Sequence, residues 1–132
     1  MKFSFQKRIY GCECDIYGHL NNANYLPILE AARSEALQEM GMPIQKLLDL
    51  NWHIYVMKVE LDFIKPVLLE DIIEVRSTVL EMNKVKSIWQ QEVYDSSSNL
   101  CFRSILKAVF AHNGKPARLI PEIYSVFENY LK

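Results

Sequence analysis

The spacing of hydrophobic residues changes along the chain. A strand and a long helix are predicted first, and a run of strands follows. From Phe3 to Cys12 apolar and polar residues alternate, which predicts a strand. From Ala23 to Met40 apolar residues recur every three or four positions, which predicts a long helix that Gly41 and Pro43 end. The buried face of this helix is expected to consist of Leu26, Leu29, Ala32, Ala36, Leu37 and Met40.

The rest of the chain is dominated by a period of two. Pro43 to Leu50 has room for a short helix, and a last helix is expected from Pro121. The connections Met82 to Lys84 and Asp95 to Asn99 have the length of hairpin loops, so the strands around them should be antiparallel neighbours. Four strands are predicted near residues 55–63, 73–79, 85–93 and 102–110, and the first should bury Tyr55, Met57, Val59, Leu61 and Phe63.

This order of elements predicts a single α+β domain over residues 1–132. A sheet with one apolar face needs a cover, and the alanine-rich helix is the one predicted element long enough to supply it. We therefore expect a five-stranded antiparallel sheet curled around one long central helix.

Composition and charge narrow the classes of function. Of the 132 residues, 50% are hydrophobic and 23% are charged, which is typical of soluble globular proteins. The formal net charge of -1 gives no basic excess for nucleic-acid binding. Charged residues near Met1 interrupt any secretory apolar run, and no apolar stretch reaches the roughly 18 residues of a membrane span. We expect a cytoplasmic protein without a membrane span.

The three cysteines, Cys12, Cys14 and Cys101, do not fit a disulfide framework. Cys12, Cys14 and the nearby His19 lack the paired spacing and the fourth ligand of a zinc site. We expect reduced, partly buried thiols, with no metal and no cofactor.

The candidate chemistry lies in the turn between the first strand and the long helix. Asp15 and His19 share this short segment, and the free N–H groups of the following helix start favour a developing negative charge. A simpler interpretation is an ordinary turn, with Asn21 or Asn22 capping the helix.

The string from Asp15 to Tyr25, Asp-Ile-Tyr-Gly-His-Leu-Asn-Asn-Ala-Asn-Tyr, resembles hotdog-fold acyl-CoA thioesterases of the 4-hydroxybenzoyl-CoA thioesterase type. The order of the elements agrees with this, as do the segments around Phe63–Pro66 and Gly114–Arg118. The resemblance implies a hotdog fold, a homodimer whose two sheets join edge to edge with the site at the interface, and tetramers built from such dimers.

The resemblance also implies the hydrolysis of an acyl thioester to the free acid and CoA. Asp15 would be the catalytic carboxylate, acting either as a general base on water or as a nucleophile that forms a mixed anhydride. His19 would bind the substrate or hold Asp15. Further substrate contacts are expected from Tyr17, Gly18, Asn22 and Tyr25.

Other residues have a structural as well as a functional interpretation. Lys65, Lys115 and Arg118 are candidates for the CoA phosphates, although surface bases are common. Glu30 and Arg33 have the spacing of an ion pair on a helix surface. Core positions are expected for Tyr25, Tyr55 and Trp89, whereas His53 and His112 have no assigned role.

Three alternatives to an acyl-CoA thioesterase follow from the same fold. One is a thioesterase that takes its acyl group from an acyl-carrier protein, and another is a module that binds acyl thioesters without hydrolysing them. A hydratase is the least favoured, because the acids of the long helix are limited to Glu30, Glu35 and Glu39.

Overall fold

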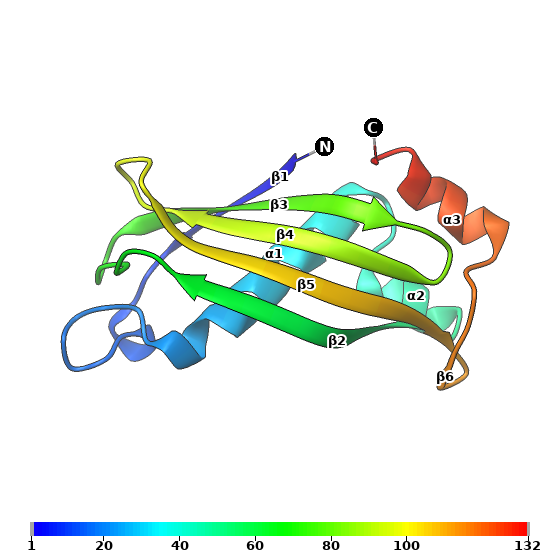
Figure 1. The fold of residues 1–132 in the computed structure, drawn as a ribbon, viewed down its shortest axis with the longest axis horizontal. Coiled ribbons are helices and arrows are strands. Elements are labelled where there is room, and N and C mark those ends of the chain that lie inside the picture. Colours follow the sequence, from blue (N-terminus) through cyan, green and yellow to red (C-terminus); the bar gives the residue numbers. More distant parts are fainter. Residues whose placement is uncertain (1, 132) are drawn as a thin grey trace.

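One antiparallel sheet packs against the longest helix in a computed structural model that describes residues 2–131 (Figure 1). Short 3-10 helices at Gly11–Glu13 and Asn22–Asn24 flank the loop that leads into this helix. The regular elements are β1 (Lys2–Arg8), α1 (Tyr25–Glu39), α2 (Ile44–Asp49), β2 (Trp52–Phe63), β3 (Ile72–Met82), β4 (Lys86–Tyr94), β5 (Leu100–His112), β6 (Lys115–Pro116) and α3 (Pro121–Glu128).

The strands are ordered β1-β3-β4-β5-β2, and the two-residue β6 pairs with β5. All pairs are antiparallel, and the β3–β4 and β4–β5 hairpins join sequential neighbours as predicted. β2 pairs only with β5 in the described sheet, so it is an edge strand. Its register with β5 shifts between Val56 and Lys58, which marks a β-bulge at Met57.

The sheet curves around α1, so the core lies between the helix and the concave face of the sheet (Figure 1). Two hydrophobic clusters divide the length of α1 between them. One surrounds its second half and includes Leu37, Trp89 and Phe127. The other surrounds its first half and includes Tyr25, Leu29 and Phe102. The predicted α+β architecture, a sheet curled around one central helix, is confirmed.

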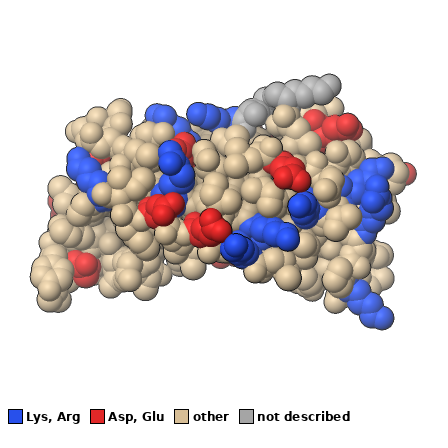
Figure 2. Space-filling view, viewed as in Figure 1, with Lys and Arg blue, Asp and Glu red and all other residues tan. Residues whose placement is uncertain are grey.

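The outer face of the sheet is polar and mixed in charge. Figure 2 shows basic and acidic side chains interspersed over this face. Several of them form ion pairs within or between strands, including Arg103–Glu92, Arg76–Glu74 and Lys58–Glu60. The solvated pair Lys58–Glu60 contributes little to stability. None of the helices formed within residues 2–131 is both long and apolar enough to cross a membrane.

Three details of the sequence prediction are wrong. β1 ends at Arg8 and not at Cys12, because Glu13 accepts the Tyr10 N–H and pairs with Lys7 at 2.8 Å, which closes a turn. The described sheet also contains β6, which follows the turn at Asn113 and Gly114, where both residues have positive φ. On α1, Leu26 was predicted to be buried but is 45% exposed, and Ile28, which is 4% exposed, packs on the core in its place.

The buried face of β2 also differs from the prediction. Val59 and Leu61 pack on the core, whereas Tyr55, Met57 and Phe63 are 41%, 63% and 54% exposed. The bulge at Met57 changes the alternation, and an edge strand has no neighbour to cover its outward residues.

Candidate active site

Asp15 lies in a tight turn that its own side chain closes. Its carboxylate Oδ1 accepts the N–H of Tyr17 at 2.9 Å and the N–H of His19 at 3.3 Å. Its backbone N–H donates to the His19 carbonyl at 2.9 Å, and its carbonyl accepts the Gly18 N–H at 3.1 Å. Gly18 has φ of 74°, a conformation that glycine adopts without steric cost. The turn thus fixes the carboxylate from the main chain.

This turn is anchored to the loop that follows β2. Leu20 donates to the Val67 carbonyl at 2.7 Å, and Leu69 donates to the Gly18 carbonyl at 2.9 Å. The Asn21 side chain accepts the Ala23 N–H at 2.9 Å, so Asn21 is the residue that caps the start of the helix. The C-terminal side of the turn is therefore held both by the loop after β2 and by the start of the helix.

A pocket of about 280 Å³ opens beside the half-buried Asp15. Its walls come from the turn, from the start of α1 and from the end of β2, and they include Asp15, His19, Asn22, Tyr25, Phe63 and Lys65. The structure thus brings together five of the predicted site residues, since all of these except Phe63 were predicted from the sequence.

Aromatic rings form the wall behind the pocket. Tyr25 stacks on the fully buried Phe102 with ring centroids 4.4 Å apart, and Phe63 meets both rings edge-on at 5.3 and 5.2 Å. Burial raises the pKa of Tyr25 to about 12, with a smaller contribution from Cys101. The Tyr25 hydroxyl is therefore protonated at neutral pH and does not act as a base.

The cysteine next to Asp15 does not have the character of a nucleophile. Burial, together with the charge of Asp15, raises the pKa of the Cys14 thiol, so it is protonated at neutral pH. Cys101 is buried and its pKa is also raised by burial. Cys12 is exposed, and all three thiols are free.

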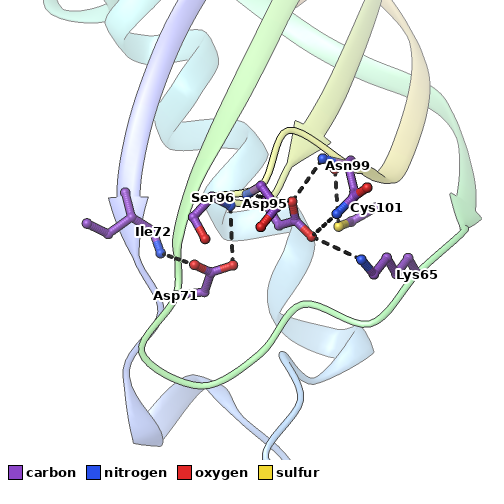
Figure 3. Close-up of polar contacts among 8 residues, drawn as sticks. Lys65, Asp71, Ile72, Asp95, Ser96, Asn99 and Cys101 are labelled. Carbon is purple, nitrogen blue, oxygen red and sulfur yellow. Dashed lines mark hydrogen bonds and ion pairs between the residues drawn. The ribbon is translucent and has the colours of Figure 1, made fainter.

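Lys65 is tied to the hairpin between β4 and β5. Its Nζ lies 3.3 Å from Oδ2 of Asp95, and the Asp95 carboxylate also accepts the N–H and the side-chain amide of Asn99 (Figure 3). Asp71 binds the N–H of Ser96 in the same cluster. Hydrogen bonds from Asn99 and the ion pair with Lys65 lower the pKa of Asp95 to about 2. This cluster holds the loop that supplies one side of the pocket.

The remaining predicted site residues lie elsewhere. Tyr17 is 75% exposed and does not line the pocket, and Gly18 serves the turn through its backbone. Lys115 and Arg118 are exposed near β6, at the opposite end of β2 from Phe63 (Figure 1). Since a strand rises roughly 3.3 Å per residue, the 12 residues of β2 separate them from Asp15 by roughly 35 Å within one chain.

A second cavity of about 400 Å³, between α1, α2 and the first half of β2, was not predicted. The predicted surface pair of Glu30 and Arg33 is wrong: Arg33 is half-buried and donates to Oε1 of the buried Gln91 at 2.9 Å. Trp89 is buried and Tyr25 is buried, as predicted, whereas Tyr55 is exposed. The alternation that places Gln91 in one row with Trp89 and Val93 was the available signal that Gln91 is buried, but it gave no sign of the cavity.

His53 lies at the start of β2, and His112 lies at the end of β5 that pairs with it. His112 stacks on Trp52, and His53 stacks on Tyr55. The Nδ1 atom of His53 is buried without a hydrogen-bond partner among residues 2–131. In that same part of the chain no three His, Cys, Asp or Glu side chains gather in an arrangement that would hold a metal ion.

The model of the family described as the Thioesterase-like superfamily matches residues 12–127. The acyl-CoA thioesterase YbgC of Haemophilus influenzae is 26% identical over 130 residues, which cover 96% of this chain and 95% of that protein.

Solved structures agree in fold. The hypothetical protein TT1821 from Thermus thermophilus has a TM-score of 0.92 at 20% identity over 97% of this chain and 98% of the other. The hypothetical protein SAV2348 from Staphylococcus aureus, solved in complex with CoA, has a TM-score of 0.91 at 10% identity, covering 99% and 84%. The predicted hotdog fold and thioester hydrolase class are confirmed, and the chain belongs to the thioesterase-like superfamily.

Proposed function

We propose that this protein hydrolyses acyl-CoA thioesters, with the carboxylate of Asp15 as the reacting group. The observation that carries the proposal is the fixed carboxylate beside a pocket at a helix start. Its Oδ1 is held by two backbone N–H groups, while Oδ2 has no hydrogen-bond partner within residues 2–131. A carboxylate with one oxygen fixed and the other available suits either role expected of it.

In the general-base route, Asp15 takes a proton from water as the water oxygen attacks the thioester carbonyl carbon. The carbonyl oxygen becomes negative, and collapse of the intermediate breaks the carbon–sulfur bond and releases CoA, whose thiolate takes up a proton. In the nucleophilic route, Asp15 itself attacks and displaces CoA, and water then opens the anhydride. Both routes give a free acid and CoA.

Asn22 is our candidate donor to the developing oxyanion. In the short helix before α1, the Ala23 N–H donates to the Asn21 side chain and the Asn24 N–H donates to the Asn21 carbonyl. The N–H of Asn22 has no such partner among the described residues, and Asn22 lines the pocket. A donor aimed at an oxyanion lowers the barrier by roughly 3 kcal/mol.

His19 is a candidate for a substrate contact. Its main-chain N–H, and not its imidazole, binds the Asp15 carboxylate. The ring lines the pocket and is therefore available to hydrogen-bond the thioester carbonyl. Lys65 lines the same pocket and is our candidate for a contact with a CoA phosphate.

The proposed active unit is a homodimer in which β2 pairs with a second copy. β2 is the edge of the described sheet, and Val56 and Met57 on it are 49% and 63% exposed. An unpaired edge of this kind favours pairing with another strand. If two β2 strands pair antiparallel over their whole length, Phe63 lies opposite Trp52 of the partner subunit. Lys115 and Arg118 near β6 then approach the partner's Asp15 pocket, which a single chain does not allow.

The test is the release of free thiol from short, medium, long and aromatic acyl-CoAs, with Asp15→Asn assayed beside the wild-type protein. We expect the wild-type protein to hydrolyse at least one class, and Asp15→Asn to hydrolyse that class far more slowly. Binding without release across the whole panel would support a non-catalytic module. Release from acyl-carrier-protein thioesters alone would identify the other carrier as the substrate.

A further inference from the structure

The second cavity combines apolar walls with one half-buried cation. Leu47, Trp52, Trp89, Leu106 and Ala108 supply apolar surface, and the half-buried Arg33 enters from α1. No carboxylate of residues 2–131 lies within ion-pair distance of the Arg33 guanidinium. A charge taken out of water without a counter-ion is costly, so a cavity with such a residue on its wall suits an anionic ligand.

Gln91 holds Arg33 in this position without neutralising it. The Gln91 amide nitrogen donates to the Leu29 carbonyl at 3.0 Å and to the Ser77 hydroxyl at 2.9 Å. Because a carbonyl accepts only, these bonds fix the amide so that its oxygen faces Arg33. Burial lowers the pKa of Arg33, an effect that the charge of the exposed Glu30 opposes. The guanidinium stays charged at neutral pH and has further N–H donors to offer.

One stripe of α1 connects this cavity with the Asp15 pocket. Leu26, Glu30 and Arg33 follow on α1 at spacings of four and three, so they lie along one side of the helix, and Asn22 lies in the 3-10 helix that leads into α1. Asn22 borders the first pocket, and Glu30 and Arg33 border the second. Leu26, which lies between them, is exposed to solvent. β2 follows the same course, with Phe63 at the first pocket and Tyr55 at the second.

We propose that the acyl group extends from the thioester at Asp15 along this stripe, and that Arg33 binds a carboxylate at its far end. The preferred substrates are then half-thioesters of dicarboxylic acids, with an apolar chain between the thioester and the free carboxylate. His53, whose buried Nδ1 has no partner among the described residues, lines the same cavity and offers a second polar contact. This inference deepens the proposed function and rests on it.

The eleven positions from Asn22 to Arg33 span roughly 16 Å at about 1.5 Å per residue, so the test needs a long acyl chain. Hydrolysis of two acyl-CoAs of equal chain length, dodecanoyl-CoA and dodecanedioyl-CoA, tests the inference. We expect the wild-type protein to favour dodecanedioyl-CoA by about tenfold or more in kcat/KM, the effect of one charge-assisted bidentate contact. Arg33→Met should abolish this preference while leaving the dodecanoyl-CoA rate within a few fold, and Arg33→Lys should retain part of it. Arg76→Met, on β3 in an ion pair with Glu74, is the matched control.

A binding measurement separates this inference from the proposed function. Both tryptophans of the chain, Trp52 and Trp89, line the cavity, so their fluorescence reports occupancy without turnover. With Asp15→Asn as the non-hydrolysing protein, dodecanedioyl-CoA should bind more tightly than dodecanoyl-CoA, and adding Arg33→Met should remove the difference. Thermal melts of each variant verify that it is folded.

The outcomes are distinct. Binding that depends on Arg33 and on the terminal carboxylate, without any thiol release, leaves the carboxylate site standing and refutes the thioesterase proposal. Thiol release at equal rates from both substrates, with or without Arg33, keeps the enzyme and overturns the inference. If Arg33→Met weakens both ligands equally or dissociates the dimer, Arg33 contacts the second copy and the inference is likewise wrong.

Discussion

Phe102 supports the candidate site from behind, and its replacement by alanine tests this link between core and site. The ring is fully buried and stacks on Tyr25 at 4.4 Å, so its removal leaves a cavity under the wall of the Asp15 pocket. Removal of a buried phenylalanine costs about 3–5 kcal/mol. At about 2.1 cal/mol/K per residue, the 132 residues have an unfolding entropy near 0.28 kcal/mol/K. The melting temperature should therefore fall by about 10–18 °C.

The matched control is Phe63→Ala. Phe63 touches the same two rings but is 54% exposed, so its loss should lower the melting temperature by only a few degrees. Calorimetry or circular dichroism during heating measures both shifts. Phe102→Ala should also raise KM more than it lowers kcat, because Tyr25 loses its support while Asp15 keeps its main-chain bonds. Equal shifts for the two alanine variants would refute the reasoning.

Three further predictions follow from the structure. Val56→Asp on β2 should convert the dimer to monomers, as measured by light scattering, and abolish thiol release. Val85 is 47% exposed and Val56 is 49% exposed, so Val85→Asp is the matched control and should do neither. An unchanged dimer in Val56→Asp would exclude β2 as the interface. Burial raises the pKa of Tyr25 to about 12, so the neutral hydroxyl stabilises the fold below pH 10, and this contribution is lost as the pH rises toward 12. Thermal melts between pH 9 and 12 should therefore show a steeper fall in melting temperature for the wild-type protein than for Tyr25→Phe. The lowered pKa of Asp95, about 2, gives stability that is present above pH 4 and is lost as the pH falls through 2. Asp95→Asn should therefore be less stable than the wild-type protein at pH 5 and should lose less stability between pH 4 and 2. Parallel curves of melting temperature against pH would contradict the role of this carboxylate.

Local patterns predicted the turn, the helices and the hairpins because their causes are local. The Asp15 turn closes through bonds to Tyr17 and His19, all within five residues. The stop at Gly41, where φ is 78°, likewise depends on its own backbone. Such features are determined by neighbours in the sequence, and the structure confirms them.

The sequence did not predict features that depend on distant parts of the chain. Met57 breaks the alternation of β2 by a bulge against β5, and no residue near it signals the change. Arg33 was paired with Glu30 by helical spacing, but its partner is Gln91, 58 positions away. The second cavity exists only where α2 and β2 meet α1, so no single segment contains its pattern.

The claim that matters most is that the Asp15 carboxylate carries out the chemistry. An asparagine at this position retains an oxygen that accepts the N–H groups of Tyr17 and His19, so the turn and the melting temperature should be preserved. The most direct measurement is the rate of thiol release by Asp15→Asn relative to wild type on the best acyl-CoA. We expect a fall of about 10²–10⁴-fold in kcat with the dimer intact. A folded variant that retains wild-type turnover would contradict the account.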